Sequence, residues 1–239
     1  MIILREPNLS EITKCPYFGE LTCRFRYFFA RGLSGEELNI LLTGGWRKFG
    51  TYYFKPECGN CRRCIPVRVP VMRFAPGRSQ RRVLKKAQSA EVRFGPLDYR
   101  QEIYDIYRDH SFSRFGRETD EDEFITTFYN QSCPSMQSEY SYNGNLFGVG
   151  FLDRSSEALS SMYFTFRKEY SGFSPGILSI IKEIEFAAAM DLSYYYLGYY
   201  IALNGSMSYK NRFHPYEWYD WESAHWLPET VADRAKTGI

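Results

Sequence analysis

The pair Asn143-Gly144 constrains the fold of this chain more than any other short segment. Both residue types tolerate the positive φ angles of a type I′ turn, and the flanking stretches 139–142 and 145–149 are rich in strand-forming residues. A β-hairpin is therefore predicted here. Residues 159–166 supply a third strand, so the three segments should form an antiparallel meander.

A loop and an amphipathic helix follow the meander. Residues 170–176 are rich in Ser, Gly and Pro, and Ile177, Ile181 and Ile184 then recur at helical spacing before a strand at 194–201. Three antiparallel strands, a loop, a helix and a further strand are the order of elements in the N-acyltransferase (GNAT) core. We therefore expect an α+β fold of that type, an expectation about fold and not about chemistry.

The first part of the chain has a different pattern. Ser34 and Glu37 form a capping box ahead of a short helix, and Ile65-Pro-Val-Arg-Val-Pro-Val71 alternates like a strand whose prolines suit a sheet edge. We predict a small, cysteine-containing α+β domain over residues 1–96 and an N-acyltransferase-like domain over residues 97–239.

Positive charge is concentrated in one block. Residues 62–93 contain ten Lys or Arg and one acidic residue, a net charge of +9 in a chain whose net charge is +2, so the remainder sums to −7. Five of these cations lie in a predicted helix at 78–88. Such a patch attracts phosphate backbones through counterion release, which indicates a nucleic-acid partner.

Three cysteines, Cys58, Cys61 and Cys64, stand two residues apart. Thiolates at this spacing bind zinc or an iron-sulfur cluster, and Cys15 before Pro16 is the expected fourth ligand. A reduced, metal-free turn is the alternative. The chain has no run of about 18 apolar residues, and its N-terminal segment carries charges, so we expect a cytoplasmic protein that does not span a membrane.

The loop before the predicted helix at 177–188 is a candidate anion site. Ser174 and Gly176 lie at a helix N-terminus, where free N–H groups favour an anion such as a phosphate. The loop lacks the [QR]xxGx[GA] spacing that holds the coenzyme A pyrophosphate, which disfavours an acetyl-CoA donor. With three histidines and no Ser-His-Asp spacing, no catalytic histidine is assigned.

Two motif sets make the chain similar to a known family. The first is Cys58-x-x-Cys61-x-x-Cys64-Ile-Pro-Val-Arg-Val-Pro with Arg78-Ser-Gln-Arg81-Arg82; the second runs from Leu159-Ser-Ser-Met-Tyr163 through Tyr196-Leu-Gly-Tyr199 to Met207-x-Tyr209-Lys210-x-x-Phe213-x-Pro215. With these motifs the chain resembles the arginyl/leucyl-tRNA:protein transferases, and in size the bacterial aspartate/glutamate leucyltransferases. The match spans roughly residues 15–220.

The resemblance implies a Fem-type GNAT-like fold and transfer of an amino acid from a charged tRNA to proteins with N-terminal Asp or Glu, which marks them for degradation. It also implies a possible iron-sulfur site at Cys15, Cys58, Cys61 and Cys64. The sequence departs from the family at Lys85-Lys86-Ala87, at 173–176 and at 204–206. Leucine is the expected donor and arginine the alternative.

Each expected role follows from reaction chemistry. The tRNA ester is already activated, so the transfer needs neither ATP nor a cofactor, only orientation and oxyanion stabilisation. Residues expected near the ester are Lys210, Tyr199 and Tyr163. Residues expected to bind the acidic side chain of the acceptor are Arg78 and Arg81. Residues expected to contact tRNA are Arg82, Lys85, Lys86, Ser174 and Gly176.

The expected partners are therefore an aminoacyl-tRNA and proteins with acidic N-termini, with no DNA. Two rival functions use the same features differently: an acetyl-CoA-dependent N-acetyltransferase, and a non-enzymatic RNA-binding protein with a zinc-like cysteine turn.

Overall fold

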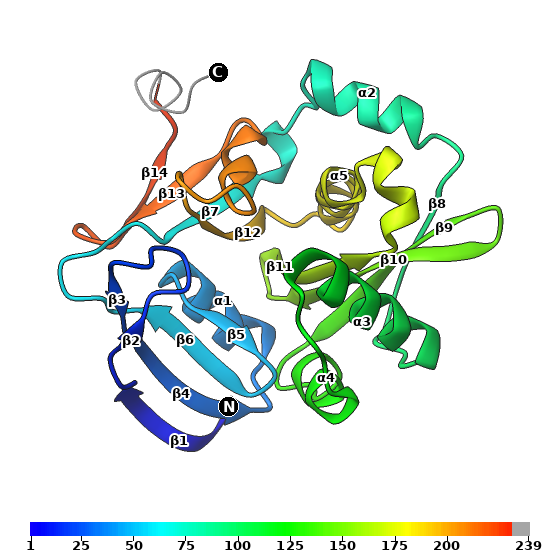
Figure 1. Cartoon of the computed structure of the whole chain (residues 1–239). Helices are drawn as coiled ribbons and strands as arrows, with labels where there is room; N and C mark the ends of the chain where they lie inside the picture. Colours follow the sequence, from blue (N-terminus) through cyan, green and yellow to red (C-terminus); the bar gives the residue numbers. More distant parts are fainter. Residues whose placement is uncertain (231–239) are drawn as a thin grey trace.

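The computed structural model describes residues 1–230 (Figure 1). The helices are α1 (Gly35–Thr43), α2 (Arg78–Lys86), α3 (Gln101–Phe115), α4 (Glu121–Phe128) and α5 (Pro175–Ala189), with short 3-10 helices η1 (Val71–Arg73), η2 (Lys168–Phe173) and η3 (Ser208–Arg212). The strands are β1 (Ile2–Leu9), β2 (Thr13–Lys14), β3 (Thr22–Cys23), β4 (Phe25–Arg31), β5 (Arg47–Phe49), β6 (Tyr52–Pro56), β7 (Ile65–Pro70), β8 (Glu91–Gly95), β9 (Ser135–Tyr142), β10 (Asn145–Arg154), β11 (Ala158–Phe166), β12 (Tyr194–Tyr200), β13 (Glu217–Asp220) and β14 (His225–Pro228).

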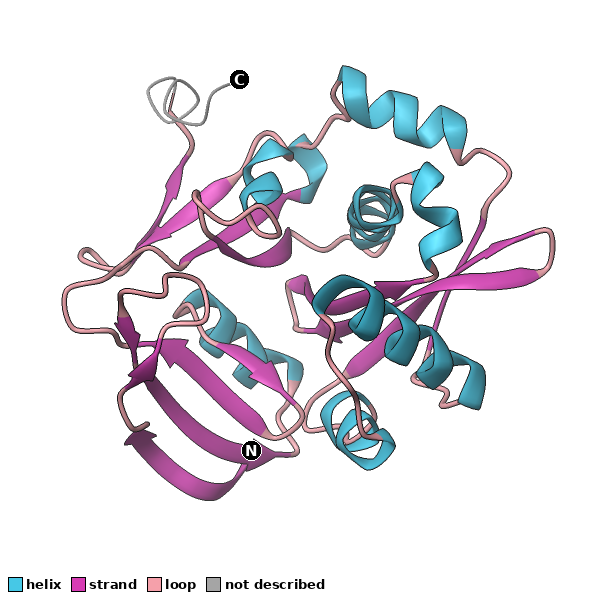
Figure 2. Cartoon of the chain, in the orientation of Figure 1, coloured by secondary structure: helices cyan, strands magenta, loops and turns pink. Residues whose placement is uncertain are grey.

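An eight-stranded mixed sheet in the order β14-β13-β7-β12-β11-β10-β9-β8 forms the centre of the fold. The predicted hairpin is confirmed as β9 and β10, joined at Asn143 and Gly144 with φ angles of 49° and 77°. Successive β10 residues point to opposite faces: Phe151 packs with α3 and α4, and Leu152 packs with α5. Helices therefore cover both faces of the sheet (Figure 2).

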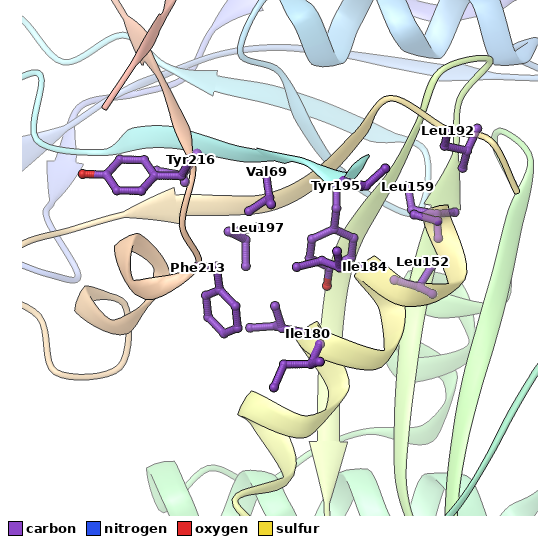
Figure 3. Close-up of a cluster of buried hydrophobic side chains, with 14 residues drawn as sticks. Val69, Leu152, Leu159, Ile180, Ile184, Leu192, Tyr195, Leu197, Phe213 and Tyr216 are labelled. Carbon is purple, nitrogen blue, oxygen red and sulfur yellow. The ribbon is translucent and has the colours of Figure 1, made fainter. Parts of the chain in front are cut away.

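The apolar face of α5 builds the largest core cluster. Ile180, Ile181 and Ile184 pack against Leu159 and Leu197 from neighbouring strands. Figure 3 shows Ile180 and Ile184 together with Leu159 and Leu197 between the helix and the sheet. The helical spacing of the isoleucines thus did predict the buried face. Along residues 1–230, no helix has the length and apolar character needed to cross a membrane.

The prediction that residues 65–71 form an edge strand is wrong. β7 lies inside the large sheet, between β12 and β13. Its prolines are tolerated because β13 pairs only with Val67 and Arg68, so Pro66 and Pro70 flank that short ladder and no hydrogen bond to β13 requires their missing N–H groups.

A second sheet, in the order β1-β4-β6-β5, packs with α1 against the large one. Phe28 and Leu38 from this part lie in one cluster with Ala158 and Tyr196 of the large sheet. The large sheet also takes β7 and β8 from before residue 96, so strands from both sides of the expected domain division are neighbours. The division at residue 96 stays a prediction, and residues 231–239 of the expected second domain lie outside the described residues.

The two parallel strands of the large sheet separate after a short pairing. β11 and β12 pair only from Ala158–Tyr194 to Ser160–Tyr196. Beyond this point β11 continues along β10 and β12 continues along β7, with a bulge between Tyr196 and Gly198. Gly198 has a φ of 85°, a conformation that disfavours residues with a Cβ. The sheet is thus divided where the remaining parts of β11 and β12 begin.

Candidate functional site

Two cationic side chains meet beside Gly198 at this division. A Cβ on Gly198 would lie 3.2 Å from Nζ of Lys210 and 3.5 Å from Nη2 of Arg47. Arg47 comes from β5 of the small sheet, and Lys210 comes from η3, which follows β12. Because the guanidinium is positively charged, and the lysine is too when protonated, the arrangement favours a negative charge, such as a developing oxyanion, beside them.

The turn before β5 fixes the position of Arg47. Gly45 has a φ of 78°, and a Cβ there would lie 2.9 Å from Cη2 of Trp221, so the close packing requires glycine. Nη1 of Arg47 then donates to Oγ of Ser160 at 2.7 Å, and Nη2 donates to the carbonyl of Ser161. Both acceptors are neutral, so these hydrogen bonds hold the guanidinium without neutralising its charge.

Lys210 has an environment unusual for a lysine. Burial, together with the like charge of Arg47, lowers the pKa of its ammonium group to about 7. Its neighbour Asn211 is buried and Tyr209 packs against the main core, so the backbone of η3 that carries Lys210 is held in position. A lysine with this pKa can donate a hydrogen bond as an ammonium group or accept a proton as an amine near neutral pH.

Tyr199 is a neighbour of Arg47 at this division of the sheet. Its hydroxyl donates to the carbonyl of Gly45 at 3.3 Å, which joins β12 to the turn before β5. Burial raises the pKa of Tyr199, and the neighbouring Arg47 cation opposes part of that rise. The phenol therefore stays protonated and is a hydrogen-bond donor.

Tyr163 is separate from this group. It projects from β11 toward α3 and α4, with ring contacts to Tyr107, His110 and Phe128 at centroid distances of 5.8, 6.3 and 5.5 Å. Burial raises its pKa to about 12. Of the three residues expected near the ester, the structure places Lys210 and Tyr199 near Arg47 and directs Tyr163 toward the α3 side.

The basic helix α2 packs on the outside of α5 (Figure 1). Gln80, which is buried, donates from Nε2 to the carbonyl of Arg212 at 3.1 Å and so anchors the helix near η3. The residues of this helix that are expected to bind tRNA or the acceptor are all exposed: Arg78, Arg81, Arg82, Lys85 and Lys86. Among them Arg81 donates to the carbonyl of Pro76 at 2.8 Å.

The last turn of α2 approaches the loop before α5. A Cβ on Gly172 would lie 3.8 Å from Nζ of Lys86. Ser174 is exposed, with a φ of 52°, and its side chain does not cap the helix. Ser174, Gly176 and Lys86 thus lie in one region where N–H groups and a cation can meet a phosphate.

Cys15 and Cys23 lie near the cysteines of the 58–64 turn, without forming a recognisable ligand set. Burial raises the pKa of the Cys64 thiol to about 12, with further contributions from Cys58 and Cys15. Sγ of Cys58 donates to the carbonyl of Arg24 at 3.6 Å, and all six cysteines are free thiols. Within residues 1–230 no group of three or more His, Cys, Asp or Glu side chains is arranged to hold a metal ion. The structure therefore does not supply the metal geometry that the resemblance implies.

Sequence reasoning missed Arg47. Gly44 and Gly45 are typical of a helix end, and nothing local in the sequence connects Arg47 to Ser160, which lies 113 positions away. Two glycines directly before the Trp-Arg-Lys stretch, and Gly50 with a φ of 54° after it, are the available signal of a shaped loop.

Known proteins resemble the chain along most of its length. Residues 13–82 match the model described as "Arginine-tRNA-protein transferase, N terminus", and residues 100–220 match "Arginine-tRNA-protein transferase, C terminus". An aspartate/glutamate leucyltransferase of Alkalilimnicola ehrlichii is 34% identical over 227 residues, covering 91% of this chain and 92% of that protein. The enzyme of the same name from Thiobacillus denitrificans is 35% identical over 179 residues, covering 73% and 75%.

Among solved structures, L-PGS from Bacillus licheniformis aligns with a TM-score of 0.50 at 10% identity, covering 73% of this chain and 63% of that one. At this identity the likeness concerns the fold alone. The two family models together cover more than half of the chain, and the relatives exceed 30% identity over most of it. The chain therefore belongs to the arginine-tRNA-protein transferase family.

Proposed function

We propose that the chain transfers leucine from leucyl-tRNA to the α-amine of proteins that begin with Asp or Glu and so marks them for degradation. The names of its relatives in two bacteria support the donor and the acceptors. The observation that carries the chemistry is the convergence of Arg47 and Lys210 beside Gly198, in a family whose reaction passes through an oxyanion.

In the proposed reaction the neutral α-amine attacks the ester carbonyl at the tRNA 3′ end. A C–N bond forms, the carbonyl oxygen becomes an oxyanion, and the C–O bond to the ribose then breaks. The proton lost by the amine ends on the ribose oxygen. Lys210, with a pKa of about 7, carries that proton in transit, and Arg47 stabilises the oxyanion. Tyr199 donates a hydrogen bond nearby, and Tyr163 borders the ester from the α3 side.

The remaining charged residues bind the two substrates. Arg82, Lys85 and Lys86 meet tRNA phosphates, with Ser174 and Gly176 receiving one at the α5 N-terminus. Arg78 and Arg81 bind the acidic side chain of the acceptor, a task for which the guanidinium fork is suited. The exposure of all five cations on α2 supports both roles.

A Fem-type GNAT-like fold is the finer fold assignment that we propose, supported by the element order and by the division between β11 and β12. Its charged-tRNA and protein substrates place the reaction in the cytoplasm. The chemistry needs no cofactor, and zinc or a cluster at Cys15, Cys58, Cys61 and Cys64 has no part in the steps above.

The proposal is tested by incubating the protein with leucyl-tRNA or arginyl-tRNA and with peptides that begin with Asp, Glu, Lys or Ala. Mass spectrometry should detect added leucine on the Asp and Glu peptides only. Addition of arginine instead would select the sister activity. Acetyl transfer from acetyl-CoA, or tRNA binding without any transfer, would replace the proposal with one of its two rivals.

A further inference from the structure

The last turn of α3 exposes two large aromatic rings. Phe112 is 65% exposed and Phe115 is 55% exposed, and they stand three positions apart, so they are neighbours on the helix surface. The helix ends directly after them at Gly116, which has a φ of 60°. Adjacent exposed rings on a folded protein indicate a binding surface.

Beneath these rings lies a histidine without hydrogen-bond partners. His110 is 6% exposed, and neither ring nitrogen has a partner among the described residues. Its ring meets Phe115 edge-on at 6.2 Å and lies 4.8 Å from Phe166. A buried polar group of this kind normally has a partner, so His110 keeps unused hydrogen-bonding capacity beneath the exposed rings. Burial keeps the imidazole neutral, with a pKa of about 4, and so leaves one donor and one acceptor.

A cation accompanies the rings. The guanidinium of Arg114 lies 5.8 Å from the ring centroid of Phe115. Its charge also acts on Tyr163 of β11 and Tyr209 of η3, where it opposes part of the pKa rise that burial causes. Because Tyr209 directly precedes Lys210, this surface borders the proposed reaction centre.

We propose that Phe112, Phe115, Arg114 and His110 form the binding site for the 3′-terminal adenosine of the donor tRNA. The inference rests on the proposed function and names the part of the protein that holds the reacting end of that substrate. Flat aromatic rings stack on bases, and arginine meets the adjoining phosphate. The neutral imidazole has one donor and one acceptor nitrogen, and one of them supplies a hydrogen bond to a polar edge of adenine. An apolar peptide segment would use the rings but would leave the arginine and the histidine unused.

The test uses uncharged tRNA in two forms, one intact and one lacking only the terminal adenosine. Binding is measured by fluorescence anisotropy at one fixed low salt concentration. Stacking of one base predicts that the wild-type protein binds the intact tRNA roughly 5- to 100-fold more tightly than the shortened one. The double variant Phe112→Ala/Phe115→Ala should bind both forms equally, and Phe115→Leu should lose most of the difference because leucine lacks a flat ring.

Ile40→Ala is the matched control, because Ile40 is 70% exposed on α1, and it should keep the wild-type ratio. His110→Leu should reduce the ratio without abolishing it. The ratio does not depend on transfer, so a protein that discriminates the two tRNAs but transfers no leucine would contradict only the proposed function. Equal binding of both tRNAs by the wild type, or an unchanged ratio in the double variant, would overturn the adenosine site. Weaker acceptor-peptide binding with an unchanged ratio would overturn it too, and would assign the rings to the protein substrate.

Discussion

Lys48 and Asp153 form a buried ion pair that joins β5 to β10. Nζ of Lys48 lies 3.1 Å from Oδ1 of Asp153, and each side chain is 4% exposed. Oγ of Ser135 also donates to Asp153, at 2.9 Å. Since Lys48 follows Arg47 directly, the pair holds the strand that presents Arg47 to Ser160 and Ser161.

Replacing Lys48 by Met should destabilise the protein by about 3–5 kcal/mol, because Asp153 would keep a buried charge without its partner. Urea unfolding measures the change. Lys182→Met is the control, since Lys182 pairs with Glu185 at 2.8 Å on an exposed helix surface and should change stability by less than about 0.5 kcal/mol. Equal effects of the two substitutions would mean that the buried Lys48–Asp153 pair contributes no more to the free energy of unfolding than an exposed pair does.

The pKa of Lys210 predicts how transfer depends on pH. Its pKa is lowered to about 7, so the neutral amine predominates above pH 7 and the ammonium below it. Leucine transfer should fall with decreasing pH below 7, and Lys210→Ala should lower turnover by roughly 100-fold or more at pH 8. The acceptor α-amine also titrates, near about 8, in every variant. The wild-type to variant rate ratio across pH 5.5–9 therefore isolates the lysine; a ratio that is flat across that range would remove Lys210 as the proton carrier.

The same group contributes to stability with a defined sign. In the unfolded chain Lys210 stays protonated up to its usual pKa of 10.5, but in the folded chain only up to about 7. Between these values the unfolded state binds more protons, so this contribution to the unfolding free energy increases as pH rises from 7 toward 10. The stability of the wild type minus that of Lys210→Met should increase over that interval. A decreasing difference would mean that the lysine remains charged in the folded protein.

Gly150 is predicted to tolerate no side chain. A Cβ there would lie 2.4 Å from Oγ of Ser138 and 2.6 Å from Oε1 of Glu183, a buried carboxylate that also accepts a hydrogen bond from Tyr195. Gly150→Ala should destabilise the protein by about 1–3 kcal/mol through overpacking. Gly95→Ala, at a position with nothing within 4 Å of the added Cβ, is the control and should have little effect in thermal unfolding.

How much of this site the sequence could predict depends on how local its causes are. The β9–β10 hairpin was predictable because Asn143 and Gly144 specify their turn by themselves, and α5 was predictable from its isoleucine spacing. The position of β7 inside the sheet was not predictable. Its prolines are excluded only where a neighbouring strand needs their N–H groups, and the sequence does not show that β13 pairs with Val67 and Arg68 alone. Arg47 was beyond local reasoning, since its role arises when the small sheet docks against Ser160.

The exposed cations of α2 predict a salt-dependent affinity for tRNA. Substitution of Arg82, Lys85 and Lys86 by Ala should reduce the slope of log affinity against log salt concentration by about 2 to 3, because each of the three lost phosphate contacts removes roughly 0.7 to 0.9. The same variant should affect charged and uncharged tRNA alike. An unchanged slope would place the tRNA backbone elsewhere on the protein.

The transfer chemistry is predicted to be independent of metal. Prolonged chelation should leave the rate of leucine transfer within about twofold of the untreated protein, because the activated ester needs no cofactor. Anaerobic purification followed by iron, sulfide and zinc analysis determines whether the thiols near Cys58 hold any metal. Loss of activity on chelation that zinc or iron restores would contradict the metal-free mechanism.

The most direct test of the central claim is competition between two peptides that differ only at their first residue, Asp against Asn, with leucyl-tRNA as the donor. The two side chains have nearly the same shape and differ in charge. The account predicts that mass spectrometry will find leucine added to the Asp peptide and essentially none on the Asn peptide. Equal addition to both would show that the protein does not select an acidic N-terminus.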